Sequence, residues 1–316
     1  MKCYKKIKKF ISTIFLIIIF LFWVYYIIKY ANNILDVIEN INWLWFFLAF
    51  IIFIPTFGIE ILNWKSLLKM SKAKISFYNA GKSWLLSNLA KYVPGTIWIP
   101  LSRSYLIKQS NISYVKAIVA WLFELYFHLA SSAFLFCLYF LFLSKNTGES
   151  IILFTICCLL TLIPLLKNYL FGFLNVVVTK IFFLKRYIHK FKNIKAYIKS
   201  ISSKMLFLLF FRTMPIWIIG GVWIFILTYS VIGQSLSVLQ FIYIWSFSWF
   251  IGQIIIFVPG GLGVREGVMV NLLNNIGIAV PSAMLIALLS RFQFVLLDGF
   301  ITLTFLKFFK NKKENS

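Results

Sequence analysis

The sequence predicts an all-α protein, a polytopic transmembrane helical bundle of about eight spans with two helices broken by Pro-Gly motifs. Hydrophobic residues make up 61% of the 316 residues, whereas an ordinary globular domain is nearer one-half apolar. They fall in runs of the length that a membrane-crossing helix needs, about 20 residues. Only short polar connections remain, so we expect a single integral membrane domain over residues 1–316 and no large soluble catalytic domain.

Seven apolar segments are predicted to be clear membrane spans. They are Phe10–Ile28, Trp43–Leu62, Val115–Leu143, Ile151–Leu166, Met205–Ile232, Val238–Val258 and Ser282–Leu306. The first span follows the basic stretch Lys2–Lys9. A basic stretch followed by an apolar run is also the pattern of a signal peptide. Because its apolar run is too long and no small-x-small cleavage site follows, we interpret it as an uncleaved span.

The basic residues predict how the chain is oriented. Lys and Arg number 32 against 8 Asp and Glu, a formal net charge of +24. Three regions are rich in Lys: the N-terminus at 1–9, a loop at 180–204 and the tail at 307–316. The positive-inside rule places all three in the cytoplasm of a bacterial-type inner membrane, where anionic lipid heads rather than nucleic acid explain the charge. Seven spans that start inside would end outside, so a further stretch must cross the membrane.

Two polar, Pro/Gly-interrupted stretches, Ser76–Leu106 and Phe257–Ile278, are candidates for that crossing or for re-entrant segments. Both contain Val-Pro-Gly followed within eight residues by Arg. The repeat pairs Val93, Pro94, Gly95 and Arg103 with Val258, Pro259, Gly260 and Arg265, and Gly261 and Gly263 extend the second motif. Such breaks survive at membrane depth only when protein or water encloses them, and matched breaks in two halves indicate a transporter site. The alternative is that Pro and Gly are simply common in membrane helices.

Half of the acidic residues, and four of the five Arg, lie within or beside the apolar segments. The acids are Glu60, Glu124, Glu266 and Asp298, and the Arg are Arg103, Arg212, Arg265 and Arg291. Each charge at the bilayer centre costs about 2.5–3.5 kcal/mol on insertion scales, so these side chains should face a shared interior and pair. By helical spacing, Arg291 and Asp298 share one face of the last span, and Glu124 and His128 share one face of the third.

The guanidinium fork of Arg matches a phosphate or carboxylate, which suits a site for an anionic lipid head. Helix starts after the two Pro-Gly breaks would add backbone N–H groups aimed at the same anion. The candidate substrate-binding residues are Arg103, Arg265, Glu266, Arg291, Asp298 and Glu124. The alternative for all of them is an internal ion-pair network that only fixes helix packing, and His128 is predicted to be a packing residue.

No cofactor or metal site is predicted. The chain has four Cys and two His, His128 and His189, without a Cys-x-x-Cys motif, so a metal or disulfide framework is not indicated. No nucleotide-binding motif is present either, which leaves passive or ion-coupled transport.

The two motifs resemble those of one membrane protein family. The stretch Ser87–Gly95 with Trp98 and Arg103, and then Pro259–Gly267, are similar to the lysylphosphatidylglycerol synthase transmembrane region, over most of the chain up to Leu306. This resemblance implies a role in translocating a phospholipid. Ser102 stands where the family's first motif often has Gly. The family's cytoplasmic aminoacyl-transferase domain is expected to be absent, because the sequence stops at Ser316 after a short Lys-rich tail.

Our leading hypothesis is therefore a flippase-like translocase, or an accessory to one, for an anionic phospholipid or a polyprenyl-phosphate-linked envelope precursor. Arg103 and Arg265 would bind the phosphate, while Glu266 and Asp298 would orient the Arg side chains or an amino group on the lipid. One alternative is a membrane glycosyl- or phosphotransferase that uses Asp36 and Glu39 of the first outer loop. Another is a non-catalytic scaffold for envelope biosynthesis enzymes. We favour a transporter over an enzyme, with membrane lipids as its partners.

Overall fold

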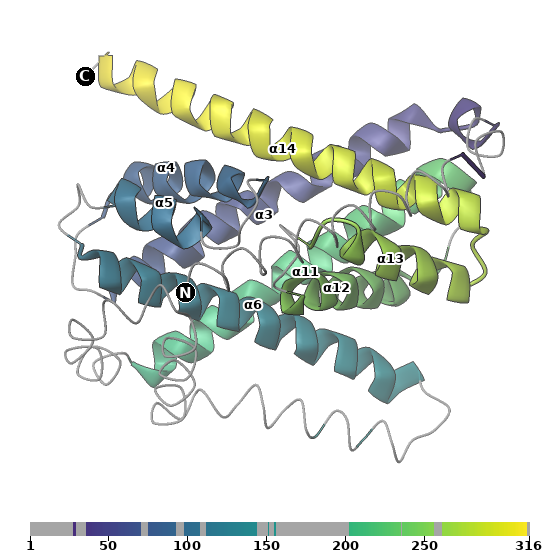
Figure 1. Cartoon of the computed structure of the whole chain (residues 1–316), viewed down its shortest axis with the longest axis horizontal. Coiled ribbons are helices and arrows are strands. Elements are labelled where there is room, and N and C mark those ends of the chain that lie inside the picture. Colours follow the sequence, from purple (N-terminus) through teal and green to yellow (C-terminus); the bar gives the residue numbers. More distant parts are fainter. Residues whose placement is uncertain are drawn as a thin grey trace, which may run out of the picture. The chain divides into compact units, whose positions relative to one another are not determined.

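The computed structural model describes residues 28–29, 36–70, 75–92, 98–107, 112–143, 151, 155, 202–234, 236–255 and 261–314. Within these ranges the protein is helical and contains no strand, which confirms the predicted all-α class (Figure 1). The helices are α3 (Trp43–Lys69), α4 (Phe77–Asn88), α5 (Trp98–Ile107), α6 (Tyr114–Leu143), α11 (Ser203–Ile232), α12 (Val238–Ile254), α13 (Val264–Asn275) and α14 (Val280–Glu314), with a 3₁₀ helix η1 at Leu89–Tyr92.

Four of the described helices are long and apolar enough to cross a membrane: α3, α6, α11 and α14. Each covers one of the predicted spans, so the chain is an integral membrane protein of the polytopic helical class. The span predicted at Val238–Val258 corresponds to α12, a shorter apolar helix that ends at Ile254. The spans predicted at Phe10–Ile28 and Ile151–Leu166 fall almost wholly outside the described residues.

The last helix extends beyond the residue at which the last predicted span ends. We expected the last span to end at Leu306 and a tail to follow, whereas α14 continues as a helix to Glu314. Lys and Glu in this stretch are good helix formers, so nothing local stops the helix before its end. The basic N-terminus at 1–9 and most of the loop at 180–204 lie outside the part that the structure describes.

Both Pro-Gly motifs lie between described helices. The α4–η1 segment ends at Tyr92 and α5 begins at Trp98, on either side of Pro94 and Gly95. In the same way α12 ends at Ile254 and α13 begins at Val264. Pro94, Gly95, Pro259 and Gly260 themselves lie outside the described residues, so the predicted shape of each break stays a prediction.

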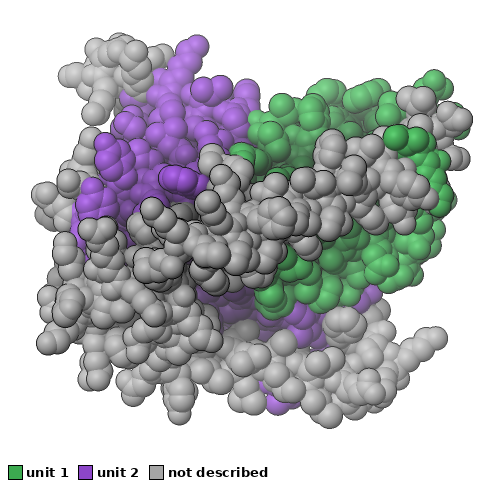
Figure 2. Space-filling model, viewed as in Figure 1, with its two compact units in different colours: residues 1–54, 91–96, 219–297 green, residues 55–90, 97–218, 298–316 purple. Residues whose placement is uncertain are grey.

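The chain divides into two compact units, coloured separately in Figure 2. Unit 1 comprises residues 1–54, 91–96 and 219–297, and unit 2 comprises residues 55–90, 97–218 and 298–316. Helices α3, α11 and α14 each continue from one unit into the other, so each unit contains a part of all three.

The core of unit 1 is a cluster of aromatic rings around the buried indole of Trp223. Phe53 of α3 and Trp245 of α12 contact this ring, at centroid distances of 4.4 and 5.0 Å. The Trp223 Nε1–H donates to Gln293 Oε1 at 2.7 Å, and the Gln293 amide donates to the Phe46 carbonyl at 2.9 Å. Both the oxygen and the nitrogen of this buried side-chain amide are therefore hydrogen-bonded, and the bonds link α14 to α11 and α3.

The core of unit 2 is built where α4 and α5 pack against α6 and part of α3. Trp64 of α3 is fully buried and its indole N–H donates to Ser83 Oγ of α4 at 3.0 Å. Ser76 starts α4 as its N-cap, because its hydroxyl accepts the Asn79 N–H at 3.1 Å and so satisfies one of the free donors of the first turn. These contacts position α4, the helix that precedes the first Pro-Gly motif.

Candidate functional site

In unit 1 the second motif makes a tight approach between α12 and the start of α13. Gly261 and Gly263 have φ values of +65° and +79°, a backbone region that favours glycine. A side chain at position 261 would also meet the backbone of Gly252, since a Cβ there would lie 3.0 Å from the Gly252 carbonyl oxygen. Both sequence-predicted glycines are therefore required by conformation, and Gly261 is required by space as well.

Glu266 is buried and joins two parts of unit 1. Its Oε2 accepts the backbone N–H of Gly263 at 2.6 Å, which caps the first turn of α13. Its Oε1 lies 3.7 Å from Nη1 of Arg291 on α14. A carboxylate at a helix N-terminus is favoured by the helix dipole as well as by the hydrogen bond. The residue is thus a helix cap that also holds the guanidinium of Arg291.

Arg265 is 3% exposed and points into the aromatic core of unit 1. Its guanidinium carbon lies 4.5 Å from the ring centroid of Trp245 and 5.2 Å from that of Phe294. Cations over aromatic faces gain about 0.5–2 kcal/mol, more when desolvated. Two rings therefore hold this charge at a fixed place inside the unit.

Residues just before the first motif lie in the same unit. Tyr92 immediately precedes Val93-Pro94, and its ring lies under the guanidinium of Arg291, 5.6 Å from centroid to Cζ. Lys91 places its Nζ 4.1 Å from the ring centroid of Phe294, the same ring that Arg265 contacts. The described residues that flank both motifs are therefore neighbours in unit 1.

We call Lys91, Arg265, Glu266 and Arg291 the cationic cluster. It contains three cations and one carboxylate. The sequence of unit 1 holds only two further acids, Asp36 and Glu39, and both are exposed. In the sequence of unit 1 the three cations of the cluster therefore outnumber its one carboxylate.

Unit 2 contains a separate ion pair between Arg103 of α5 and Glu124 of α6. The Arg103 Nη1 bonds Glu124 Oε2, and its Nε donates to Ser87 Oγ at 2.8 Å. The other Glu124 oxygen accepts the indole N–H of Trp84 at 2.8 Å. Both charged side chains are buried and both have hydrogen-bond partners, which is the arrangement that makes a buried pair tolerable.

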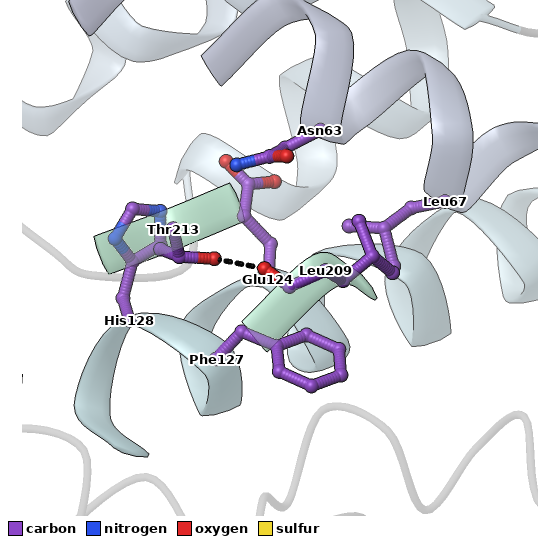
Figure 3. A pocket seen from close by; sticks show the side chains of 7 residues that line it. All are labelled: Asn63, Leu67, Glu124, Phe127, His128, Leu209 and Thr213. Carbon is purple, nitrogen blue, oxygen red and sulfur yellow. Dashed lines mark hydrogen bonds between the residues drawn. The ribbon is translucent and has the colours of Figure 1, made fainter. Parts of the chain in front are cut away.

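Next to this pair lies a second one, between His128 of α6 and Glu60 of α3. His128 Nε2 is 3.2 Å from Glu60 Oε2. A small pocket adjoins it, and Figure 3 shows the side chains that line this pocket. The lining residues are Asn63, Leu67, Glu124, Phe127, His128, Leu209 and Thr213.

One oxygen each of Glu60 and Glu124 and one nitrogen of His128 lie within 4.8 Å of one another. This spacing would suit a metal ion, but both oxygens of Glu124 already accept hydrogen bonds. The guanidinium of Arg103 also lies against this carboxylate, and it would repel a second cation. We therefore assign no metal to these residues.

The remaining predicted charges have other partners in unit 2. Arg212 donates to Asn63 Oδ1 at 2.6 Å and to Ser66 Oγ at 2.9 Å, which links α11 to α3. Asp298 is 1% exposed and accepts the side-chain amide of Asn88 at 3.0 Å. The bond to Asn88 ties α14 to the end of α4.

The structure thus brings the candidate residues together in two groups. Arg265, Glu266 and Arg291 meet in unit 1, while Arg103 and Glu124 pair in unit 2. Asp298 falls in unit 2 and Arg291 in unit 1. His128 packs edge-on against Trp217, at a centroid distance of 5.7 Å, and also pairs with Glu60.

Sequence reasoning missed Lys91 and Phe294 in the first group and the Glu60–His128 pair in the second. One signal for Lys91 was present, because it lies two residues before the first Val-Pro-Gly.

Comparison with known proteins shows the family. No curated protein matches the chain, and no solved structure matches it. The family model described as "Lysylphosphatidylglycerol synthase TM region" matches residues 10–298 of the 316. This match covers both motifs and both groups of charged residues, with Asp298 as its last position. The chain therefore belongs to the lysylphosphatidylglycerol synthase transmembrane region family, a family of lipid-related membrane proteins.

Proposed function

We propose that this protein is a flippase-like translocase that moves an anionic phospholipid, or a lipid-linked envelope precursor with a phosphate, between the two leaflets. The observation that carries the proposal is the cationic cluster of unit 1. The cluster holds three cations and one carboxylate, and Arg265 is buried against two aromatic rings. The family, which is lipid-related, agrees with a lipid as the ligand.

A phosphate is the anion that this site fits. A phosphodiester brings one negative charge to a cluster in which three cations accompany one carboxylate. The planar fork of Arg265 or Arg291 matches two phosphate oxygens at once. The start of α13 lies beside Arg265 in sequence, and its dipole favours an anion in the same place.

The remaining contacts suggest how the head group is held and released. Glu266 holds Arg291 from one side at 3.7 Å, so this guanidinium keeps its orientation when no lipid is bound. Because Glu266 is also the cap of α13, movement of the helix start would move the carboxylate away from Arg291. The polar head would then follow the broken segments at membrane depth while the acyl chains stay in lipid.

The proposal is tested in proteoliposomes that contain the full chain. Vesicles carry traces of a fluorescent phosphatidylglycerol or of a fluorescent phosphatidylcholine with the same chains, and an impermeant reductant bleaches the outer leaflet. Label in the inner leaflet is protected from the reductant until the lipid moves to the outer leaflet. We expect the protein-dependent loss of this protected fluorescence to be at least tenfold faster for the anionic lipid. Phosphatidylcholine carries the same phosphodiester with an added cation, so equal rates for both lipids would contradict selection of a net anionic head group. No protein-dependent exchange of either lipid would contradict a translocase.

A further inference from the structure

The buried ion pairs of unit 2 belong to a different unit from the cationic cluster. The proposed head-group site does not use them. They consist of Arg103 with Glu124, and His128 with Glu60. The Glu60, Glu124 and His128 ligand atoms are within 4.8 Å of one another. Two carboxylates and one histidine are thus concentrated inside helices that are apolar enough to span a membrane.

The net charge of these side chains depends on whether His128 is protonated. Among the described residues, the two carboxylates face one buried cation, Arg103, and with neutral His128 these four side chains carry one negative charge. With protonated His128, the four side chains sum to zero. An uncompensated charge among apolar helices is costly, so the balanced state is the one that holds a proton. Histidine is also the side chain that gains and loses a proton near neutral pH.

Within the described part of the chain, the charged groups that face His128 come from α3, α5, α6 and α11. They are Glu60 from α3, Glu124 from α6 itself, Arg103 from α5, and Arg212 of α11, which reaches the adjoining pocket through Asn63. Arg212 is partly exposed, so water screens its charge, whereas Arg103 is 2% exposed. Of the residues that the structure describes, Arg103, Glu124, Glu60 and His128 therefore set the charge balance between these helices.

We propose that the Glu60–His128 pair of unit 2 is a proton-binding site, and that the protein exchanges this proton as it moves lipid. A proton from the aqueous side adds to the neutral imidazole of His128 to give the imidazolium, which stays hydrogen-bonded to Glu60 through Nε2. The pocket lined by Asn63, His128 and Thr213 supplies polar surface beside the ring. Release of the same proton restores the neutral ring.

Proton occupancy would bias the arrangement of α3 against α6. Glu60 and His128 join these two helices at 3.2 Å, and the ion pair is lost when the ring is neutral. The Glu60 carboxylate then needs water or another hydrogen-bond partner. This need favours a state in which α3 and α6 separate enough for water to reach the carboxylate. The coupling rests on the proposed translocase function, whereas the proton site rests only on the geometry of unit 2.

A spectroscopic experiment tests the proton site without lipid transport. The chain has two His, so a His189→Gln background leaves His128 as the only histidine for nitrogen-15 NMR in nanodiscs. We expect the doubly protonated ring at pH 7, and the neutral ring in the Glu60→Gln variant. A neutral ring in the Glu60-containing protein, or the same ring state in both proteins, would overturn the site.

A second experiment tests the coupling in vesicles with an imposed pH gradient. One proton per lipid predicts that the steady-state ratio of labelled phosphatidylglycerol between leaflets shifts by up to about tenfold per pH unit. Glu60→Gln and, if that variant does not fold, His128→Gln should exchange lipid but lose this shift. A ratio unaffected by the gradient in the wild type overturns the coupling. Absence of any exchange overturns the translocase and its coupling, while the NMR result still decides the proton site.

Discussion

Oε1 of Glu266 lies 3.7 Å from Nη1 of Arg291, although the sequence neighbour of Glu266 is Arg265. Adjacent residues on a helix point in different directions, so the Arg265-Glu266 pair of the motif cannot close on itself. Glu266 turns to the Gly263 backbone and to α14, and Arg265 turns to Trp245 and Phe294. The motif therefore places a cap and a buried cation on two sides of one helix start.

Substitutions at Glu266 separate its two roles. Glu266→Gln keeps an oxygen for the Gly263 N–H but removes the charge beside Arg291, whereas Glu266→Ala removes both. We expect Ala to be less stable than Gln by about 1 kcal/mol, the usual worth of a cap. Thermal unfolding in detergent measures the difference. Equal stabilities would mean that the bond to Gly263 contributes nothing.

The buried pair of unit 2 predicts a non-additive result. Arg103→Gln leaves the Glu124 carboxylate buried without its cation, and breaking such a pair costs about 3–5 kcal/mol. Adding Glu124→Gln removes that charge and still accepts the Trp84 N–H, so the double variant should recover more than half of the loss. Denaturant unfolding of the purified proteins gives the three values. A double variant less stable than Arg103→Gln would contradict a charge-pair role.

Close packing of α11 on α12 in unit 1 depends on Gly221. A Cβ at this position would lie 2.4 Å from the Ile242 Cα, which is backbone and cannot rotate away. Gly221→Ala should therefore destabilise the protein by about 1–3 kcal/mol, as overpacking does. Gly299→Ala on α14 is the matched control, because nothing lies within 4 Å of its Cβ. Comparable loss in both variants would point to helix flexibility rather than to packing.

Topology remains a prediction from the Lys distribution. The positive-inside rule predicts that the loop at 180–204 and the C-terminus are both cytoplasmic. Reporter fusions at Asn193 and at Ser316 should both give the inside signal. An outside signal at Ser316 with an inside signal at Asn193 would mean an odd number of crossings between them.

The sequence was sufficient for the helical membrane class and for the positions of the long helices. Their apolar runs are long, and length with hydropathy is the strongest signal that a sequence carries. It also selected Arg103, Glu124, Arg265, Glu266 and Arg291 as buried charges, because a charge inside an apolar run must find a partner. It did not identify the partners. Pairing Glu266 with Arg291 or His128 with Glu60 depends on how separate helices pack, which periodicity within one helix does not reveal.

Arg265 is the cation on which binding of the lipid phosphate is proposed to depend most. The most direct measurement is the rate of phosphatidylglycerol exchange in vesicles for Arg265→Gln and Arg265→Lys, at protein levels matched to the wild type. Arg212→Gln serves as the control, because Arg212 is a half-buried Arg of unit 2 outside the cationic cluster. Losing a charge-assisted bond of about 1.5–3 kcal/mol predicts that the exchange rate falls by about 10- to 150-fold for Arg265→Gln. The fall should be smaller for Arg265→Lys, which keeps a point charge that cannot bind two oxygens. The control should exchange lipid at a near-normal rate. A folded Arg265→Gln protein that exchanges lipid at the wild-type rate would contradict the phosphate role.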